Sequence, residues 1–199
     1  MSRRRVDPQR AATRAARKEE LLDAAVRVIR RDGPTPSMDA IAAEAGITKP
    51  ILYRHFADRS GLVGALAARY ATELQGVLAG ALTSGSDARA LFTGTVDAYL
   101  AFVERDPHLY RFVSTSSSVE GFLQQVGREV AVVLGDQLRA AGADSGGAEP
   151  MAHGLVGFVH AAGDWWLDRR TISREQLLQY LTGLLWEGLA GLIDQRSYA

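Results

Sequence analysis

The chain has 199 residues, enough for one good core or for a small module joined to a larger one. Apolar residues make up 47% of it and charged residues 23%, which is typical of a soluble globular protein, and no uninterrupted apolar run approaches the roughly 20 residues that cross a bilayer. The lack of cysteine excludes disulfides and thiolate metal sites, and no secretory signal is recognisable, so we expect a cytoplasmic protein without membrane partners.

The two parts of the chain carry opposite net charge, although the formal total is zero. Residues 1–60 hold 13 Lys and Arg against 8 Asp and Glu, whereas residues 61–199 hold 10 against 15. Such asymmetry indicates a basic module that meets a polyanion and an acidic module with another task. The alternative is an ordinary solvated surface with uneven charge. Residues 1–12 are rich in arginine, and we expect them to form a disordered basic arm.

A first helix is predicted from about Thr13, because apolar residues recur there at spacings of three and four. Gly33 followed directly by Pro34 is a strong signal that this helix ends. The apolar positions that define it are Leu21, Leu22, Ala25, Val26 and Ile29.

Two short helices follow. Ser37 is a good N-cap for the first of them, and Gly46 closes it. Thr48 is a good N-cap for the second, which has Pro50 in its first turn and runs to residue 55 or 56. Two helices of about eight residues, separated by a glycine-containing turn, have the dimensions of a helix-turn-helix. The residues that can form a core with the first helix are Ile41, Ile47, Ile51, Leu52 and Phe56.

The outer face of the second short helix has the chemistry of a DNA-contacting surface. Lys49 can donate to a phosphate or a guanine, and Thr48, Tyr53 and His55 can reach phosphate oxygens. The positive end of the helix dipole adds to this attraction. Two other interpretations stay open, because His55 could satisfy only a terminal carbonyl and Tyr53 could pack flat on the first helix.

The run MDAIAAEAGITKPILYRHF, with the Asp58-Arg59 pair and Ser60-Gly61-Leu62 after it, resembles the DNA-binding module of the TetR family of bacterial transcriptional repressors. The resemblance implies an all-α protein. In it a three-helix helix-turn-helix module, residues 13–60, is joined by a long helix to a helical bundle, residues 61–199, that binds an effector and dimerises. It also implies contacts to double-stranded DNA from Thr35, Ser37, Thr48, Lys49, Tyr53, His55 and Arg59. The basic arm either adds minor-groove or backbone contacts or only keeps the protein soluble.

Six further helices are predicted in the second domain. The first runs over residues 60–82, with an inner stripe that includes Leu62, Leu66, Tyr70, Leu74 and Leu78. Asp87 caps the next, which ends at Asp106-Pro107; a short helix follows through Phe112, and a longer one spans residues 119–141.

The last two predicted helices are apolar around most of their circumference. They cover residues 151–170 and the segment after Ser173, which begins a capping box with Gln176. Such helices need burial on several sides, and we expect a second copy of the chain to cover one side of this helix pair. The alternative is that the apolar residues on all sides of these helices are buried in the core of a single chain. The expected interface residues are Leu178, Leu181, Leu185, Gly188, Leu189 and Leu192.

A two-fold dimer would present two recognition helices to a palindromic operator with half-sites about 34–36 Å apart. The second domain also holds more aromatic surface than a small bundle requires, which favours a pocket for a small hydrophobic or aromatic effector. The resemblance implies that this effector acts on the DNA modules through the long helix and most often relieves repression. The candidate ligand contacts are Tyr99, Phe102, Tyr110, Phe122, His160, Asp164 and Trp165.

Catalysis is not expected. The sequence lacks a Gly-x-Ser-x-Gly elbow, a phosphate loop and a dinucleotide fingerprint, and no Glu-x-x-His pair predicts a metal site, so neither a cofactor nor a metal is expected. Two other functions stay open. A sequence-indifferent DNA-coating protein would share the basic arm, and a helical ligand carrier or enzyme would use a pocket without DNA.

Overall fold

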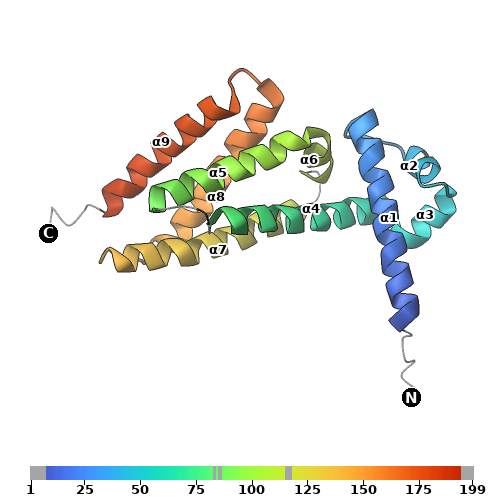
Figure 1. Cartoon of the computed structure of the whole chain (residues 1–199), viewed down its shortest axis with the longest axis horizontal. Helices are drawn as coiled ribbons and strands as arrows, with labels where there is room; N and C mark the ends of the chain where they lie inside the picture. Colours follow the sequence, from blue (N-terminus) through green and yellow to red (C-terminus); the bar gives the residue numbers. More distant parts are fainter. Residues whose placement is uncertain (1–7, 83, 85–86, 115–117, 194–199) are drawn as a thin grey trace, which may run out of the picture. The chain divides into compact units, whose positions relative to one another are not determined.

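The computed structural model of the chain describes residues 8–82, 84, 87–114 and 118–193 (Figure 1). Within these residues the protein is all-α, with nine helices and no strand, as the sequence predicts. Two compact units are formed, one from Met1–Tyr70 with His108–Ser117 and the other from Ala71–Pro107 with Ser118–Ala199. The helices are α1 (Pro8–Asp32), α2 (Met38–Glu44), α3 (Lys49–Phe56), α4 (Arg59–Leu82), α5 (Ala88–Arg105), α6 (Pro107–Ser114), α7 (Ser118–Ala140), α8 (Ala148–Arg169) and α9 (Arg174–Ile193).

Helix α1 begins at Pro8, earlier than the predicted start at Thr13. Proline suits a first helical turn, where its missing N–H needs no partner, and the alanines that follow are strong helix formers. The hydroxyl of Thr13 donates to the carbonyl of Gln9 at 2.9 Å, inside a turn that was expected to be disordered. Residues 8–12 of the expected arm are therefore helical, and residues 1–7 lie outside the described part of the chain.

The stop after α1 and the start of α2 follow the predicted local chemistry. Gly33 adopts φ +94°, a conformation that glycine accepts without strain, and its N–H donates to the carbonyl of Ile29 at 2.9 Å. Ser37 caps α2, because its hydroxyl oxygen accepts the N–H of Ala40 at 3.0 Å. The side chains of Ile41 on α2 and Leu52 on α3 are then buried in the first unit.

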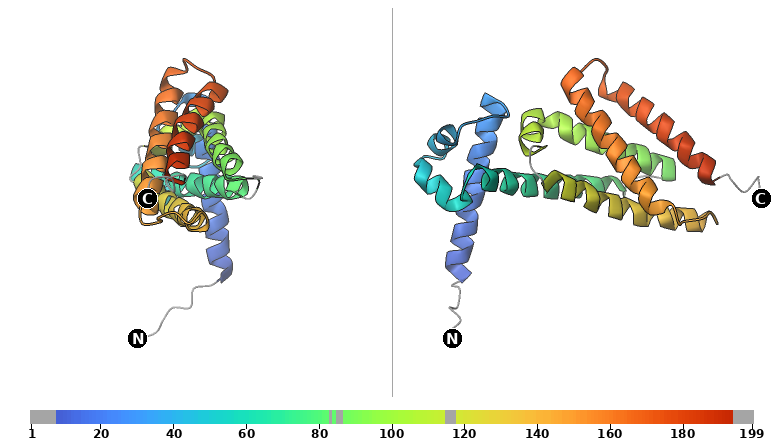
Figure 2. Two further views of the ribbon diagram at one scale, coloured as in Figure 1. Left: turned by 90° about the vertical axis from the view of Figure 1, so that its left-hand side faces the viewer. Right: turned by 180° about the vertical axis from the view of Figure 1, so that it is seen from behind.

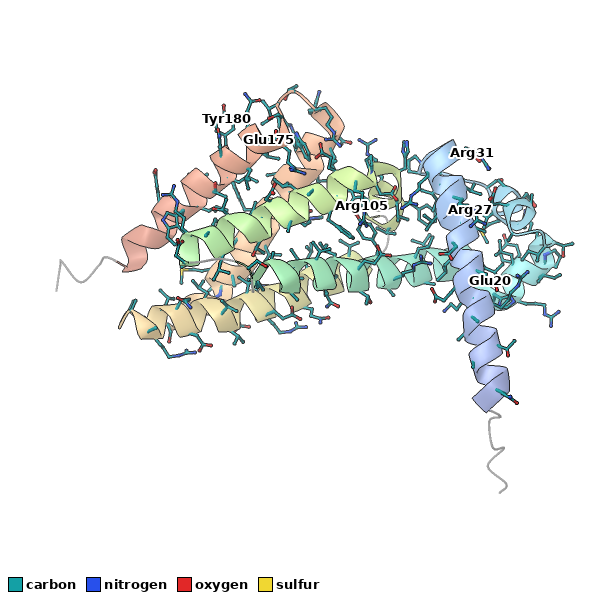
Figure 3. All side chains as sticks on the ribbon, viewed as in Figure 1. Glu20, Arg27, Arg31, Arg105, Glu175 and Tyr180 are labelled. Carbon is teal, nitrogen blue, oxygen red and sulfur yellow. The ribbon has the colours of Figure 1, made fainter. Side chains whose placement is uncertain are left out.

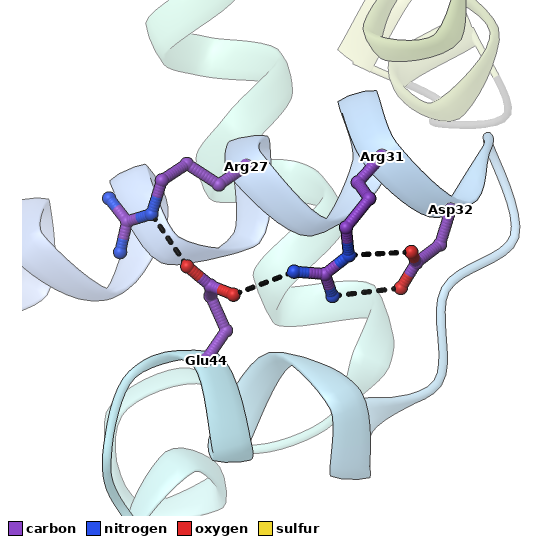
Figure 4. A network of polar contacts seen from close by, with 4 residues as sticks. All are labelled: Arg27, Arg31, Asp32 and Glu44. Carbon is purple, nitrogen blue, oxygen red and sulfur yellow. Dashed lines mark hydrogen bonds and ion pairs between the residues drawn. The ribbon is translucent and has the colours of Figure 1, made fainter.

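A network of ion pairs joins α2 to α1 (Figure 4). The carboxylate of Glu44 accepts from Arg27 at 2.8 Å and from Arg31 at 2.9 Å, and Arg31 also pairs with its neighbour Asp32. The hydrogen bonds from Arg27 and Arg31 lower the pKa of Glu44, so this carboxylate stays charged. Such exposed pairs contribute little to stability, and their main effect is to fix the side chain of Glu44 against α1.

In the second unit α7 lies against α8, and α5 lies against α9 (Figure 2). The approach of α7 to α8 depends on Gly127, because a Cβ at this position would lie 2.3 Å from Nδ1 of His153. Asp87 caps α5 by accepting the N–H of Ala90 at 2.8 Å. The predicted capping box is confirmed, since Ser173 and Gln176 exchange side-chain to main-chain hydrogen bonds at 3.0 and 3.2 Å.

Helices α4 and α6 each contribute residues to both units, because a unit boundary falls within each of them. Helix α4 contributes residues up to Tyr70 to the first unit and residues from Ala71 to the second, and nearly all of α6 belongs to the first. No helix in the described ranges is long and apolar enough to cross a membrane.

Candidate nucleic-acid interface and ligand cavity

The candidate DNA contacts of the first unit are carried by α3 and by the segment that leads into α2. Thr35, Ser37 and Thr48 are exposed, whereas Tyr53 and His55 are half-buried. Thr48 occupies the N-cap position of α3 as predicted, but its side chain makes no capping hydrogen bond. We call this set the recognition surface: Thr35, Ser37, Asp39, Thr48, Lys49, Ile51, Tyr53 and His55.

Lys49 is paired within the recognition surface. Its Nζ lies 2.8 Å from Oδ2 of Asp39, and the side chains of Lys49 and Asp39 are 43% and 68% exposed. The hydrogen bond to Asp39 raises the pKa of Lys49, so the ammonium group keeps its charge at any physiological pH. A DNA phosphate or base edge that binds this lysine competes with the carboxylate of Asp39 for the ammonium group.

Arg59 is held by groups of the first unit. One of its guanidinium nitrogens donates to the carbonyl of Pro36 at 2.6 Å, and the guanidinium lies 5.5 Å from the ring centroid of Phe112 on α6. The residue therefore joins the start of α4 to the loop before α2 and to α6. This is a structural task in addition to the phosphate contact that the sequence predicts for it.

Ile51 differs from the expectation that it lies in the core, because its side chain is 39% exposed. It follows Pro50 on the first turn of α3, two residues after Lys49. An exposed apolar side chain on such a helix can contact the methyl group of a thymine. A single apolar residue among core residues gave no signal for this role in the sequence.

A cavity of about 260 Å³ lies within the second unit. Its walls come from the end of α4 and from α5, α7 and α8, and they are mainly leucine and valine with two phenylalanines. Several of its lining residues are Leu74, Leu78, Phe92, Val96, Phe122, Val126, Val130, Leu134, Val156 and Val159.

The polar groups of this cavity are few. The hydroxyl of Tyr99 on α5 lies 3.1 Å from Nδ1 of His160 on α8, and the hydroxyl of Thr95 donates to the carbonyl of Leu91. Burial lowers the pKa of His160, although Asp164 acts in the opposite direction, so the imidazole is neutral near pH 7. None of the described lining residues is Lys or Arg. The cavity therefore suits a ligand whose buried part carries no charge.

Three of the seven candidate ligand residues line the cavity: Tyr99, Phe122 and His160. Phe102 is buried elsewhere, with the guanidinium of Arg105 4.8 Å from its ring centroid, and Tyr110 belongs to the first unit. The other two, Asp164 and Trp165, are exposed on α8. The position of Trp165 follows from helical spacing, because residues 155, 156, 159 and 160 share one face of α8 and residue 165 lies about 140° from residue 160.

Helices α8 and α9 expose apolar side chains that a single chain leaves uncovered. Leu184 and Tyr180 on α9 are 63% and 64% exposed, and Tyr180 points away from the other helices in Figure 3. On α8, Phe158 and Trp165 are exposed as well, and a Cβ at Gly157 would meet no atom within 4 Å. We call Phe158, Trp165, Tyr180 and Leu184 the apolar face. Monomeric proteins rarely expose such a set on neighbouring helices.

The residues expected at a dimer interface lie partly on another side of α9. Leu181 is 4% exposed and packs in the core of its own chain, so it is not available to a partner. Leu178 and Leu185 are half-buried, and Gly188 is exposed. The side chains of Leu189 and Leu192 lie outside the described residues. The apolar face lies on another side of α9 from Leu181. It is the better candidate for an interface with a second copy of the chain.

No group of three His, Asp or Glu side chains that could hold a metal ion occurs among the residues that the structure describes.

Comparison with known proteins matches both units to one family. Residues 21–66 match the family model described as bacterial regulatory proteins, tetR family, and residues 77–198 match the model described as tetracyclin repressor-like, C-terminal domain. An uncharacterized HTH-type transcriptional regulator of Mycobacterium tuberculosis is 36% identical over 185 residues, which cover 89% of this chain and 79% of the relative. The HTH-type transcriptional activator FasR of Mycolicibacterium smegmatis is 29% identical over 194 residues, 92% of this chain and 88% of the relative.

Solved structures have the same fold. A TetR-like transcriptional regulator from Rhodococcus sp. RHA1 superimposes with a TM-score of 0.67 at 28% identity, over 89% of this chain and 97% of that one. A TetR-family regulator from Pectobacterium atrosepticum gives a TM-score of 0.75 at 22% identity, over 96% and 98% of the two chains, and this second likeness concerns the fold alone.

Proposed function

Because the chain belongs to the TetR family of DNA-binding transcriptional regulators, we propose that it is a homodimeric repressor released from a palindromic operator by a small apolar effector. The family membership makes it a DNA-binding protein and not an enzyme. We place its action in the cytoplasm, where a regulatory protein of bacteria meets DNA.

The proposed DNA contacts are the cation and the hydrogen-bond donors of the recognition surface. The ammonium group of Lys49 and the hydroxyl groups of Thr48 and Tyr53 are donors on or next to α3, and the major groove of DNA is wide enough to admit a helix. Thr35 and Ser37 flank it as phosphate contacts, and His55 lies at the far end of the same helix. Arg59 contributes by holding α6 and the loop before α2 in place.

The apolar face supports the proposed homodimer. Two copies related by a two-fold axis would bury Leu184 and Tyr180 of one protomer against α8 and α9 of its partner. Glycines on both helices, such as Gly157 and Gly183, have open space where a Cβ would lie, so a partner helix could approach closely. A four-helix interface of this kind sets the separation of the two recognition helices and thus the spacing of the half-sites.

The cavity is the observation that carries the effector proposal. Leu74, Leu78 and Leu82 of α4 form part of its wall, and the same helix continues without a break to Arg59 in the DNA-binding unit. A molecule that fills the cavity in only one position of α4 shifts the population toward that position. The direction of regulation needs its own measurement, since FasR is named an activator.

The charge of the effector can be tested without knowing its identity. We expect dodecan-1-ol to displace the uncharged fluorescent probe N-phenyl-1-naphthylamine from the protein at a concentration at least about tenfold lower than dodecanoate or dodecylammonium. The reason is that an apolar cavity without Lys or Arg in its described lining does not compensate a buried charge. Fluorescence titration at pH 7.5 measures the displacement.

Val126→Trp is the control for this titration, because residue 126 lines the cavity and the larger side chain fills it. This variant should retain the helical circular dichroism of the wild type and lose probe binding. Equal displacement by the alcohol and the carboxylate would contradict the assignment of an uncharged effector.

A further inference from the structure

Asp39 is the acidic member of a surface whose other polar groups are cations or hydrogen-bond donors. It lies in the first turn of α2, and its side chain is 68% exposed beside Lys49. The other carboxylate of α2, Glu44, is 23% exposed and is bound by two arginines of α1. Glu44 is thus neutralised within the scaffold, whereas the partner of Asp39 is a proposed DNA contact.

The ion pair between Asp39 and Lys49 reduces the positive charge that DNA meets on the recognition surface. While Oδ2 of Asp39 accepts from Nζ of Lys49 at 2.8 Å, the two charges cancel for any phosphate at a distance. Exposed pairs of this kind are weak, so the lysine can leave its partner when a better acceptor is held at the right position. An approaching phosphate also meets the negative charge of Asp39 itself.

We propose that Asp39 is a specificity-determining residue that holds Lys49 in the free protein and penalises binding to non-specific DNA. This inference rests on the proposed DNA contact of Lys49. Non-specific binding depends almost wholly on phosphate neutralisation, so it loses one cation through the pair. In a specific complex the recognition helix is docked, and an acceptor fixed by the base sequence replaces the carboxylate. The carboxylate thus acts as a repulsive element against wrong sites.

The test uses the full chain and a duplex of random sequence. Asp39→Asn is expected to bind this DNA about two- to fivefold more tightly than the wild type, the range set by an exposed ion pair. The slope of log affinity against log salt concentration should steepen by about 0.9, which corresponds to one more phosphate contact. Fluorescence anisotropy between 50 and 200 mM salt measures both quantities, and a thermal melt checks that the fold is retained.

Asp136→Asn is the matched control. Asp136 is on α7 in the second unit, its side chain is 63% exposed and it is paired with Arg139, so the change in net charge is the same. The control should bind as the wild type does. An equal gain in affinity for Asp39→Asn and Asp136→Asn would overturn the proposal, because total charge would then explain both. Weaker binding by Asp39→Asn would overturn it too.

A double-mutant cycle with Lys49→Ala separates the pair from direct repulsion. Because Asp39 acts mainly through Lys49, the gain from Asp39→Asn is expected to be much smaller when Lys49 is already Ala. A gain of undiminished size in that background contradicts the holding role. Unchanged operator binding by Lys49→Ala alone would remove the Lys49 contact and this inference together. A loss of operator binding by Lys49→Ala, with no gain on the random duplex by Asp39→Asn, would remove only the inference and leave the proposed function intact.

Discussion

Leu184→Glu is expected to convert the proposed dimer into a monomer and to weaken binding to a two-half-site operator by roughly 100-fold or more. In one chain the side chain is 63% exposed, so a glutamate there costs the monomer little. In a two-fold dimer the same change places two like charges in an apolar interface, where desolvation and repulsion both oppose association. A monomer presents only one recognition helix to the operator, so it loses the gain in affinity that comes from binding two half-sites at once. Light scattering measures the mass, and fluorescence anisotropy measures the affinity.

Gln179→Glu is the matched control for this change. Residue 179 is exposed on the same helix and lies about 140° around it from Leu184, so the new charge is the same and the face is different. This variant should stay dimeric. If Leu184→Glu also remained a dimer with unchanged operator affinity, the interface would have to lie elsewhere.

Lys49→Ala should weaken operator binding by roughly 10- to 100-fold, because a charged contact to a phosphate or a guanine is lost. Tyr53→Phe should cost roughly two- to tenfold, the effect of one hydroxyl hydrogen bond. Neither change should alter the melting temperature much, since both side chains lie on the recognition surface. Anisotropy titrations with operator and scrambled DNA measure the two effects.

Arg128→Ala is the control for these two variants, because it removes an exposed cation from α7 in the second unit. Its affinity for the operator should equal that of the wild type. Wild-type affinity in both Lys49→Ala and Tyr53→Phe would show that α3 does not read the DNA in the proposed way.

The helices of the first unit could be predicted from sequence because residues typical of helix ends mark where they begin and end. Gly33-Pro34 and Gly46 mark stops, and Ser37 caps α2 as predicted. The early start of α1 was missed because a run of arginines was read as disorder, although alanines and Pro8 favour a helix there. Ile51 was missed because an exposed isoleucine has the same local sequence signal as a buried one.

The cavity and the apolar face were harder to predict for a related reason. An apolar stripe on a helix has the same spacing whether it packs against a neighbour, lines a cavity or binds a second copy. Sequence alone therefore placed Leu181 at the interface and Trp165 at the ligand, and the structure buries the first and exposes the second. The ligand contacts predicted from sequence are mainly aromatic, whereas the walls of the cavity are mostly leucine and valine.

The most direct test of sequence-specific regulation is selection of binding sites from a random pool of duplex DNA at about 150 mM salt, followed by anisotropy with the enriched sequence. A dimeric regulator should enrich a palindrome with half-sites about 34–36 Å apart and bind it at least about a thousandfold more tightly than scrambled DNA. A pool that stays random while the protein binds all of its members equally would contradict sequence-specific regulation and indicate a protein that coats DNA.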